Sequence, residues 1–485
     1  MSRPDKVSER ARAGVLWLGF VNVATKGSQM VVTLALAAVF TEGELGLVAL
    51  TLSLANTAMI VQSMGVNNVI THTGRDEHVM AGTALTMSLV PTTVLTLVGV
   101  LGASHIARAF DAPGAAPLIA IVAVGLPFWA FGWFQTALMN RRLDFRRRLL
   151  PDVGSAAIGA TVTLVLALRG VGPVSAAIGV LVLAVLQPFF ALLVGVRVRP
   201  TWDRGAAGEA LHWIMTVGAG AVVYTVMINV NFPIVSRLLG VDALGLYSLA
   251  FRVGMIPYLL AAVVLSAVAF PLYARLIREG RRDELAHAVA QFTHVLLLGV
   301  GGLYVILALL SGHLVIFGER WAPAVPALVA LCLYGLGLSL LTLWYQGVIV
   351  SGRLRQYLCF EIAHLALLVG LLLMFARSGI TAAAIAQTAA VWTVLAAAGV
   401  AVYRAKVAPP LGDSVRAIWG FLIPAAACVV LVVVSRWLGI EADPGSLLGA
   451  VCELIVLAGC YCGIAVLTNR SLAASLIRRQ NAEVQ

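Results

Sequence analysis

A lysine and three polar residues share one face of the first long apolar stretch. Asn22, Lys26, Gln29 and Thr33 follow one another at spacings of four, three and four residues, which places them on one side of an α-helix. Within a membrane, a charge near the centre of a helix costs about 2.5–3.5 kcal/mol on insertion scales. The stripe must therefore face a water-filled cavity or polar partners on neighbouring helices. We favour a cavity, in which the Lys26 ammonium would attract an anion such as a phosphate.

A second cation lies in the other half of the chain. Arg252 follows Ser248 by one helical turn in an apolar stretch, so it either faces a cavity or extends to the membrane interface. The preceding stretch carries small, polar and aromatic residues at three- and four-residue spacing: Trp213, Thr216, Gly220, Tyr224, Met227 and Asn231. This face is either a wall that accommodates a polar ligand, with Tyr224 and Asn231 as contacts, or a helix-packing surface.

The densest basic run of the chain is Arg141-Arg142-Leu143-Asp144-Phe145-Arg146-Arg147-Arg148. One interpretation is an anchor that contacts anionic lipid and sets the topology. The other is that Arg141, Arg142 and Arg147 capture the charged head group of a lipid diphosphate.

Carboxylates within the apolar stretches are scarce. Glu453 lies inside one stretch, whereas Asp152 and Glu361 lie near the ends of two others. Carriers coupled to protons or sodium commonly bury carboxylates for the coupling ion. Their absence from the middle of the stretches in the first half favours an anion-receiving cavity over a cation antiporter.

The elements that must position these residues are membrane-spanning helices. Of the 485 residues, 61% are hydrophobic and only 11% are charged, and the mean hydropathy is +0.97; a soluble core of this size would need more charged surface. A span requires about 20 apolar residues. We predict about fourteen spans, at 14–40, 45–66, 81–103, 116–139, 151–168, 172–196, 211–239, 244–271, 290–312, 323–349, 357–376, 380–403, 417–438 and 446–467.

The basic residues predict the orientation of these spans. With the N-terminus inside, most lysines and arginines fall in inner segments, and the outer segments hold only Arg108, Arg169, Arg237, Arg320, Arg377 and Arg436. Cytoplasmic loops retain Lys and Arg during insertion, so both termini should be cytoplasmic. The net charge of +11 is then explained by topology, and we expect no nucleic-acid partner.

No pattern for covalent chemistry is present. All six cysteines lie in apolar stretches, which favours buried thiols over disulfides or a metal site. His72 and Asp76 occupy a loop without a nucleophile or metal partner, and the sequence has no phosphate-binding loop, zinc-protease or Gly-x-Ser-x-Gly motif. We expect no catalytic residue, cofactor or metal, and a membrane enzyme is the least favoured alternative.

An internal repeat predicts the domain organisation. The segment ELGLVAL at 44–50 opens the second span, and ALGLYSL at 243–249 opens the eighth, six predicted spans later. An even number of spans per unit makes the two halves parallel, a recurrent transporter architecture. We expect an N-lobe at 1–205, a C-lobe at 206–410, and two further helices with a cytoplasmic tail at 411–485. Chance recurrence of Leu-Gly-Leu is the alternative.

Five segments, in matching order from about residue 11 to 405, are similar to one transporter family. They are AVFTEGELGLVA at 38–49, ALMNRRLDFR at 137–146, GVDALGLYSLAFR at 240–252, FGERWAPA at 317–324 and SGR at 351–353. The series resembles the polysaccharide exporters of the multidrug/oligosaccharidyl-lipid/polysaccharide (MOP) superfamily, which include Wzx-like lipid-linked oligosaccharide flippases.

The resemblance implies an all-α, two-lobed, V-shaped bundle with a cationic central cavity in the cytoplasmic membrane of a bacterium. It implies translocation of undecaprenyl-diphosphate-linked oligosaccharide by alternating access, for capsule, lipopolysaccharide or exopolysaccharide. On this hypothesis Lys26 and Arg252 attract the diphosphate. The remaining candidates, which contact sugar or line the path, are Asn22, Gln29, Thr33, Tyr224 and Asn231.

Two departures from the family pattern and two rival functions accompany this hypothesis. The chain has Asn229-Val230-Asn231 where relatives often carry Asn-x-Asp, and Gly43 where they carry proline. One rival is a cation-coupled multidrug antiporter of the same fold that depends on an acid such as Glu453; the other is a membrane enzyme of glycan assembly that depends on His72 or Asp76. The sequence leaves open coupling to H⁺ or Na⁺ and association with a polysaccharide polymerase or glycosyltransferases.

Overall fold

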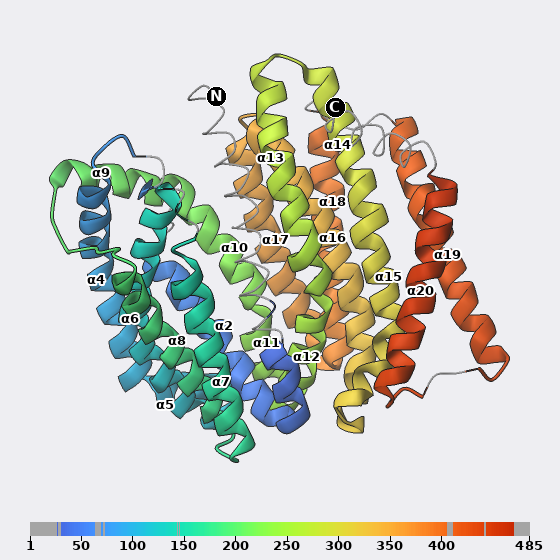
Figure 1. Ribbon diagram of the computed structural model, residues 1–485, viewed down its shortest axis with the longest axis horizontal. Helices are drawn as coiled ribbons and strands as arrows, with labels where there is room; N and C mark the ends of the chain where they lie inside the picture. The colour runs from blue at the N-terminus through green and yellow to red at the C-terminus, as the bar shows by residue number, and fades with distance from the viewer. Residues whose placement is uncertain are drawn as a thin grey trace. The chain divides into compact units, whose positions relative to one another are not determined.

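The structure is a computed structural model that describes residues 27, 31–63, 69–70, 73–142, 144, 146–404, 411–440 and 443–469. Every regular element in these ranges is a helix (Figure 1). Thirteen helical segments of the described chain are long and apolar enough to cross a membrane. They run over Glu42–Ser63, Glu77–Leu101, Pro113–Arg141, Leu149–Leu168, Val174–Leu193, Gly220–Leu239, Val241–Arg278, Glu284–Phe317, Glu319–Val350, Leu354–Ser378, Ile380–Tyr403, Gly412–Trp437 and Leu447–Thr468.

These segments match the last thirteen predicted spans in order, so the all-α polytopic membrane fold is confirmed. The first predicted span, 14–40, lies mostly outside the described residues. Membrane spans are expected to be helices, because a helix satisfies its backbone hydrogen bonds within one segment and lipid offers no hydrogen-bond partner.

The chain divides into two compact units, and the first comprises Met1–Leu249 and Leu365–Ile380. Within unit 1, α6 packs against α2, α4 and α8, and α7 packs against α8 (Figure 1). The helices that lie wholly in this unit are α2 (Glu42–Ser63), α4 (Glu77–Leu101), α5 (Ala103–Ala109), α6 (Ala116–Arg141), α7 (Ser155–Leu168), α8 (Val174–Leu193), α9 (Arg204–Trp213), α10 (Ala219–Asn229) and α11 (Asn231–Leu239).

Unit 2 comprises Ala250–His364 and Thr381–Gln485. Its centre is α16, since most residues of this helix are buried. The last two helices, α19 and α20, lie side by side (red in Figure 1). The unit boundaries fall inside α12 (Val241–Gly254), inside α17 (Leu354–Phe375) and after the first residue of α18 (Ile380–Arg404). The other helices of unit 2 are α13 (Val263–Arg278), α14 (Arg282–Leu296), α15 (Gly302–Leu309), α16 (Val325–Val350), α19 (Leu411–Trp437) and α20 (Leu447–Thr468).

The repeated Leu-Gly-Leu segments pack against each other within unit 1. Gly46 of α2 lies against the backbone carbonyl of Val241, and Gly245 of α12 lies against the backbone carbonyl of Glu42. Each glycine is four residues into its helix and contacts the first residue of the other helix. Small residues allow two membrane helices to approach this closely. Such a reciprocal contact is expected for a repeat and not for a chance recurrence.

The seventh predicted span is not one continuous α-helix. A π-helical segment, Ile214–Gly218, separates α9 from α10, and the α-helical pattern breaks again at Val230 before α11. An extra residue in a helical turn rotates the following side chains by about 100°. The prediction that Trp213 and Asn231 lie on one continuous helical face is therefore wrong.

A further difference concerns the predicted inner loop at 197–210. Its second part forms α9, which begins after Asp203, whose carboxylate accepts a hydrogen bond from the backbone N–H of Ala206 (2.7 Å). The guanidinium of Arg75 holds this helix through Glu209, at 3.0 Å. In Figure 1, α9 lies across the end of α4. Two charged residues, Arg204 and Glu209, interrupt this short helix, so it does not form an apolar run.

Candidate functional site

The polar stripe of the first span is described only at its last member. Asn22, Lys26 and Gln29 lie outside the described residues. Thr33 is buried, with 7% of its surface exposed. The cavity that this stripe predicts stays a prediction.

The remaining predicted ligand contacts differ in how deeply their side chains are buried in the protein. Tyr224 is half-buried in α10, whereas Asn231, at the start of α11, is fully buried. The Asn231 amide donates a hydrogen bond to the Tyr247 hydroxyl at 3.0 Å, which ties α11 to α12 within unit 1. Arg252 is half-buried near the end of α12.

A pair of asparagines that the sequence analysis did not select lies in unit 1. The amide of Asn56, on α2, donates to the side-chain oxygen of Asn229, on α10, at 3.4 Å. Asn229 is buried, but Asn56 is exposed although it lies within a membrane span. An exposed amide in a span needs water or a polar ligand. Its signal in the sequence was the polar run Ser53, Asn56 and Thr57, at helical spacing.

The basic run after α6 makes many contacts within unit 1. Arg141 donates to the backbone carbonyls of Ile70 (2.6 Å) and Thr73 (3.0 Å) and pairs with the Glu77 carboxylate (3.3 Å). Arg142 pairs with the same carboxylate at 2.6 Å. These two arginines thus connect the end of α6 to the start of α4. Their proposed role with a lipid head group would be additional to this structural one.

The later arginines of the run differ in exposure. The side chain of Arg147 is 55% exposed and pairs with Asp144 at 3.1 Å. The side chain of Arg148 is 11% exposed, and its guanidinium pairs with the buried Asp152 at 2.6 Å. Of these two, Arg147 is therefore the one placed to meet a ligand from outside, whereas Arg148 is part of the interior.

Asp76, one of the two residues of the rival enzyme hypothesis, caps α4. Its carboxylate accepts hydrogen bonds from the backbone N–H groups of His78 (2.9 Å) and Val79 (3.0 Å). The bond from Val79 is the main cause that holds the pKa of Asp76 below its ordinary value of 3.8. His72 lies outside the described residues. The geometry of Asp76 is that of a helix N-cap.

Replacing Asp76 with alanine is expected to lower the apparent melting temperature slightly at neutral pH, since the cap is lost. A carboxyl whose pKa is depressed by folding stabilises the protein above its unfolded pKa, and this stabilisation is lost as pH falls through the folded pKa. The difference between wild type and D76A should therefore shrink below pH 3.8. Asparagine caps equally well without titrating, so D76N should stay near the wild type at neutral pH. A pH-independent D76A difference would contradict the assignment.

Unit 1 contains an apolar cavity between α2, α4, α5 and α6. Its volume is about 270 Å³, and Thr51 and Thr57 are the polar side chains in an otherwise hydrocarbon lining. Such a cavity suits hydrocarbon and not a sugar or a phosphate.

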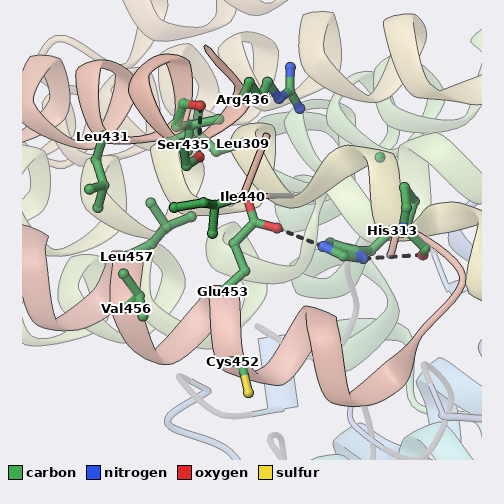
Figure 2. A pocket seen from close by; sticks show the side chains of 13 residues that line it. Leu309, His313, Leu431, Ser435, Arg436, Ile440, Cys452, Glu453, Val456 and Leu457 are labelled. Carbon is green, nitrogen blue, oxygen red and sulfur yellow. Dashed lines mark hydrogen bonds and ion pairs between the residues drawn. The ribbon is translucent and has the colours of Figure 1, made fainter. Parts of the chain in front are cut away.

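Unit 2 contains a more polar pocket of about 400 Å³, lined by the end of α15 and parts of α19 and α20. Figure 2 shows that Glu453 and His313 point toward each other, with Arg436 elsewhere in the lining. The Nε2 atom of His313 lies 2.8 Å from Glu453 Oε2, and its Nδ1 lies 3.1 Å from the carbonyl oxygen of Pro444.

The imidazole of His313 is held at both ring nitrogens. A carbonyl oxygen only accepts hydrogen bonds, so the Nδ1–H group donates to the carbonyl of Pro444. Both partners are satisfied, which makes the pair a connection between α20 and the segment after α15.

Among the residues that the structure describes, no group of three His, Cys, Asp or Glu side chains is close enough to hold a metal ion. The six cysteines are free thiols.

Comparison with known proteins places the chain in a family. Residues 35–326, more than half of the chain, match the family described as polysaccharide biosynthesis protein. The lipopolysaccharide biosynthesis protein WzxC of Escherichia coli (strain K12) is 24% identical over 68% of this chain and 67% of its own length. The succinoglycan biosynthesis transport protein ExoT of Rhizobium meliloti (strain 1021) is 25% identical with the same coverage.

Solved structures of a lipid II flippase and of a MATE transporter share the fold. The lipid II flippase MurJ, in an inward closed conformation, superposes with a TM-score of 0.75 at 14% sequence identity, over 95% of this chain and 99% of MurJ. An outward-facing MATE multidrug transporter gives a TM-score of 0.57 at 15% identity, over 81% of this chain and 96% of its own. With its sequence match over more than half of its length, this chain belongs to the polysaccharide biosynthesis protein family, and it shares the fold of these solved structures.

Proposed function

We propose that the protein is a flippase that translocates polyprenyl-diphosphate-linked oligosaccharide across the bacterial cytoplasmic membrane for surface polysaccharide biosynthesis. The observation that carries this proposal is family membership over residues 35–326. It is joined by relatives named for lipopolysaccharide biosynthesis and succinoglycan transport and by the fold of a lipid II flippase. The chain needs no covalent chemistry for this task, so the protein is a transporter and not an enzyme.

The physical task explains why such a carrier needs a polar interior. An oligosaccharide diphosphate carries many hydroxyls and negative charge, and burying them in hydrocarbon without partners is costly. A cavity that opens to one side of the membrane at a time, between two repeat-related lobes at 1–205 and 206–410, would supply water and polar contacts throughout. The polyprenyl tail would stay in lipid.

In this proposal the cations attract the head group and the uncharged polar residues meet the sugar. Lys26 and Arg252 would contact the diphosphate, and Arg147 would be the exposed arginine that first captures it at the inner surface. Asn56, exposed in the span of α2, joins Tyr224 as a sugar contact. The clustering of basic residues in alternate loops supports cytoplasmic termini.

The proposal is tested by complementation in a bacterium that lacks its own exporter for a defined surface glycan. The wild-type protein should restore the glycan at the surface and deplete lipid-linked oligosaccharide that accumulates inside. Restored growth on toxic cationic dyes without any effect on glycan would instead support the multidrug antiporter. Product formation from a lipid-linked acceptor by the purified protein would support an enzyme.

In the same strain, K26A should reduce surface glycan about tenfold or more, since a hydrogen bond to a charged group contributes about 1.5–3 kcal/mol. K26R is the matched control, because it keeps the positive charge and should retain most export. Protein amounts in the membrane must be equal. Undiminished export by K26A would remove Lys26 from the mechanism.

A further inference from the structure

The interior of unit 2 encloses a carboxyl and an imidazole on the same helix. Glu361 and His364, both on α17, are 2% and 0% exposed. A separation of three residues places them next to each other on one helical face. Glu361 lies about 10 Å along the helix from its first residue, at a rise of 1.5 Å per residue. Both groups therefore lie within the span.

The polar atoms of these two residues lack hydrogen-bond partners among the described residues. They are Oε2 of Glu361 and both ring nitrogens of His364. No ion pair within the described ranges includes either residue, in contrast to Glu453, which is bonded to His313. Buried polar groups without partners are rare in native proteins, and those that occur call for an explanation such as a catalytic or exchange role.

Several tyrosines lie near Glu361. Its carboxyl is within electrostatic range of the hydroxyls of Tyr334 and Tyr345 on α16 and of Tyr357 on α17. The rings of Tyr345 and Tyr357 meet edge to face at 5.0 Å between centroids.

More distant neighbours complete this environment. Tyr258, which precedes α13, interacts with Tyr334 and Tyr357, and its hydroxyl lies 3.3 Å from Thr342 Oγ1. Gln387, on α18, is fully buried.

The chemistry of this cluster selects a proton over a metal cation. Hard cations such as Na⁺ and Mg²⁺ prefer a shell of oxygen ligands, and carboxylates usually supply much of it. Here one carboxylate stands beside a nitrogen heterocycle. An imidazole and a carboxyl at adjacent helical positions both accept a proton, and burial without a counter-charge makes a change of charge at either one costly. The protonation of such a pair therefore depends strongly on its access to water.

We propose that Glu361 and His364 form a proton-exchange site that takes up and releases one proton in each transport cycle. A proton from water bonds to a free carboxylate oxygen of Glu361, and the lone pair of a His364 ring nitrogen accepts it in turn when access changes. Release returns the proton to water on the other side, so no oxidant or further reactant is needed. The link between proton exchange and the transport cycle rests on the proposed function. The exchange itself needs only the residues of unit 2.

Infrared difference spectroscopy of the full protein in lipid nanodiscs tests the exchange without any lipid-linked substrate. A carboxyl that gains a proton gives a C=O stretching band, which moves in D₂O. We expect the wild type to show this band as a function of pH, E361Q to lose it, and E453Q to keep it. H364N, which removes the neighbouring base, should shift the midpoint of the titration. Equal melting temperatures of wild type and E361Q ensure that the loss is not due to unfolding.

Two results would overturn the proposal. One is a pH-dependent carboxyl band that is unchanged in both E361Q and H364N. The other is a higher melting temperature in NaCl than in choline chloride at the same pH, seen in the wild type but not in E361Q. This result would identify a sodium site.

Proteoliposomes that enclose a pH-sensitive dye provide the functional arm. An imposed pH gradient should accelerate flipping of a fluorescent polyprenyl-diphosphate oligosaccharide by the wild type. In E361Q this increase in the flipping rate should be at least tenfold smaller. If the wild type flips no such lipid but the Glu361 band titrates, the proposed function fails and the proton site stands. If flipping proceeds and no proton gradient affects it, the proton site fails and the function stands.

Discussion

Replacing Arg148 with alanine is expected to destabilise the protein by about 3–5 kcal/mol, the usual cost of leaving one charge of a buried pair without its partner. The Arg148 guanidinium lies 2.6 Å from Asp152 Oδ2 and donates a second bond to the side-chain oxygen of Asn140, also at 2.6 Å. Asp152 has 8% of its side chain exposed and accepts a further bond from Gln187 at 3.3 Å. Alanine leaves the Asp152 carboxylate buried within unit 1 without its counter-charge.

The apparent melting temperature of the purified protein in detergent measures this loss. R146A is the matched control, since Arg146 belongs to the same basic run but is exposed and should change stability little. Removing both charges, in R148M/D152N, should recover part of the loss, because the unpaired charge is then absent. Equal melting temperatures for R148A and R146A would show that the buried pair contributes no stability.

The second large effect is expected at the contact between the two repeated segments. In G245A the added methyl group would come closer than 3.0 Å to the backbone carbonyl of Glu42, and in G46A to that of Val241. Backbone atoms cannot move aside as a side chain can, so the two helices must separate. We expect a net loss of about 1–3 kcal/mol, as in overpacked cores, although alanine favours a helix by about 1 kcal/mol relative to glycine.

Gly43 provides the control for this experiment. A methyl group there would first meet the end of the Asp242 side chain, which can rotate away, so G43A should change the melting temperature little. Because the contact is reciprocal, G46A and G245A should have similar effects, and the double variant should lose less than the sum of both. A stabilising effect of either single variant would show that the helices do not approach as described.

The sequence alone determined the spans of this protein and their order. Hydropathy is a local property, and a run of about 20 apolar residues has to become a helix in lipid regardless of its neighbours. The repeat was visible for a similar reason: Gly46 and Gly245 occur in recurring local segments, and both are needed for the same contact. Family resemblance added the function class, which the comparison with known proteins then supported.

Only the tertiary structure decided which polar residues have partners. Within the sequence, Glu361, Glu453 and Asp152 are three similar acids in apolar surroundings. In the structure, Asp152 meets Arg148, and Glu453 meets a histidine 140 residues away. Among the described residues, one carboxylate oxygen of Glu361 has no hydrogen-bond partner.

The physical reason is that pairing depends on how helices rotate and approach one another. The π-helical segment Ile214–Gly218 shows how one irregular turn changes which residues share a face. Spacing along one helix predicts the face on which a residue lies, but the partner comes from another helix, and its position follows from the packing of the whole unit.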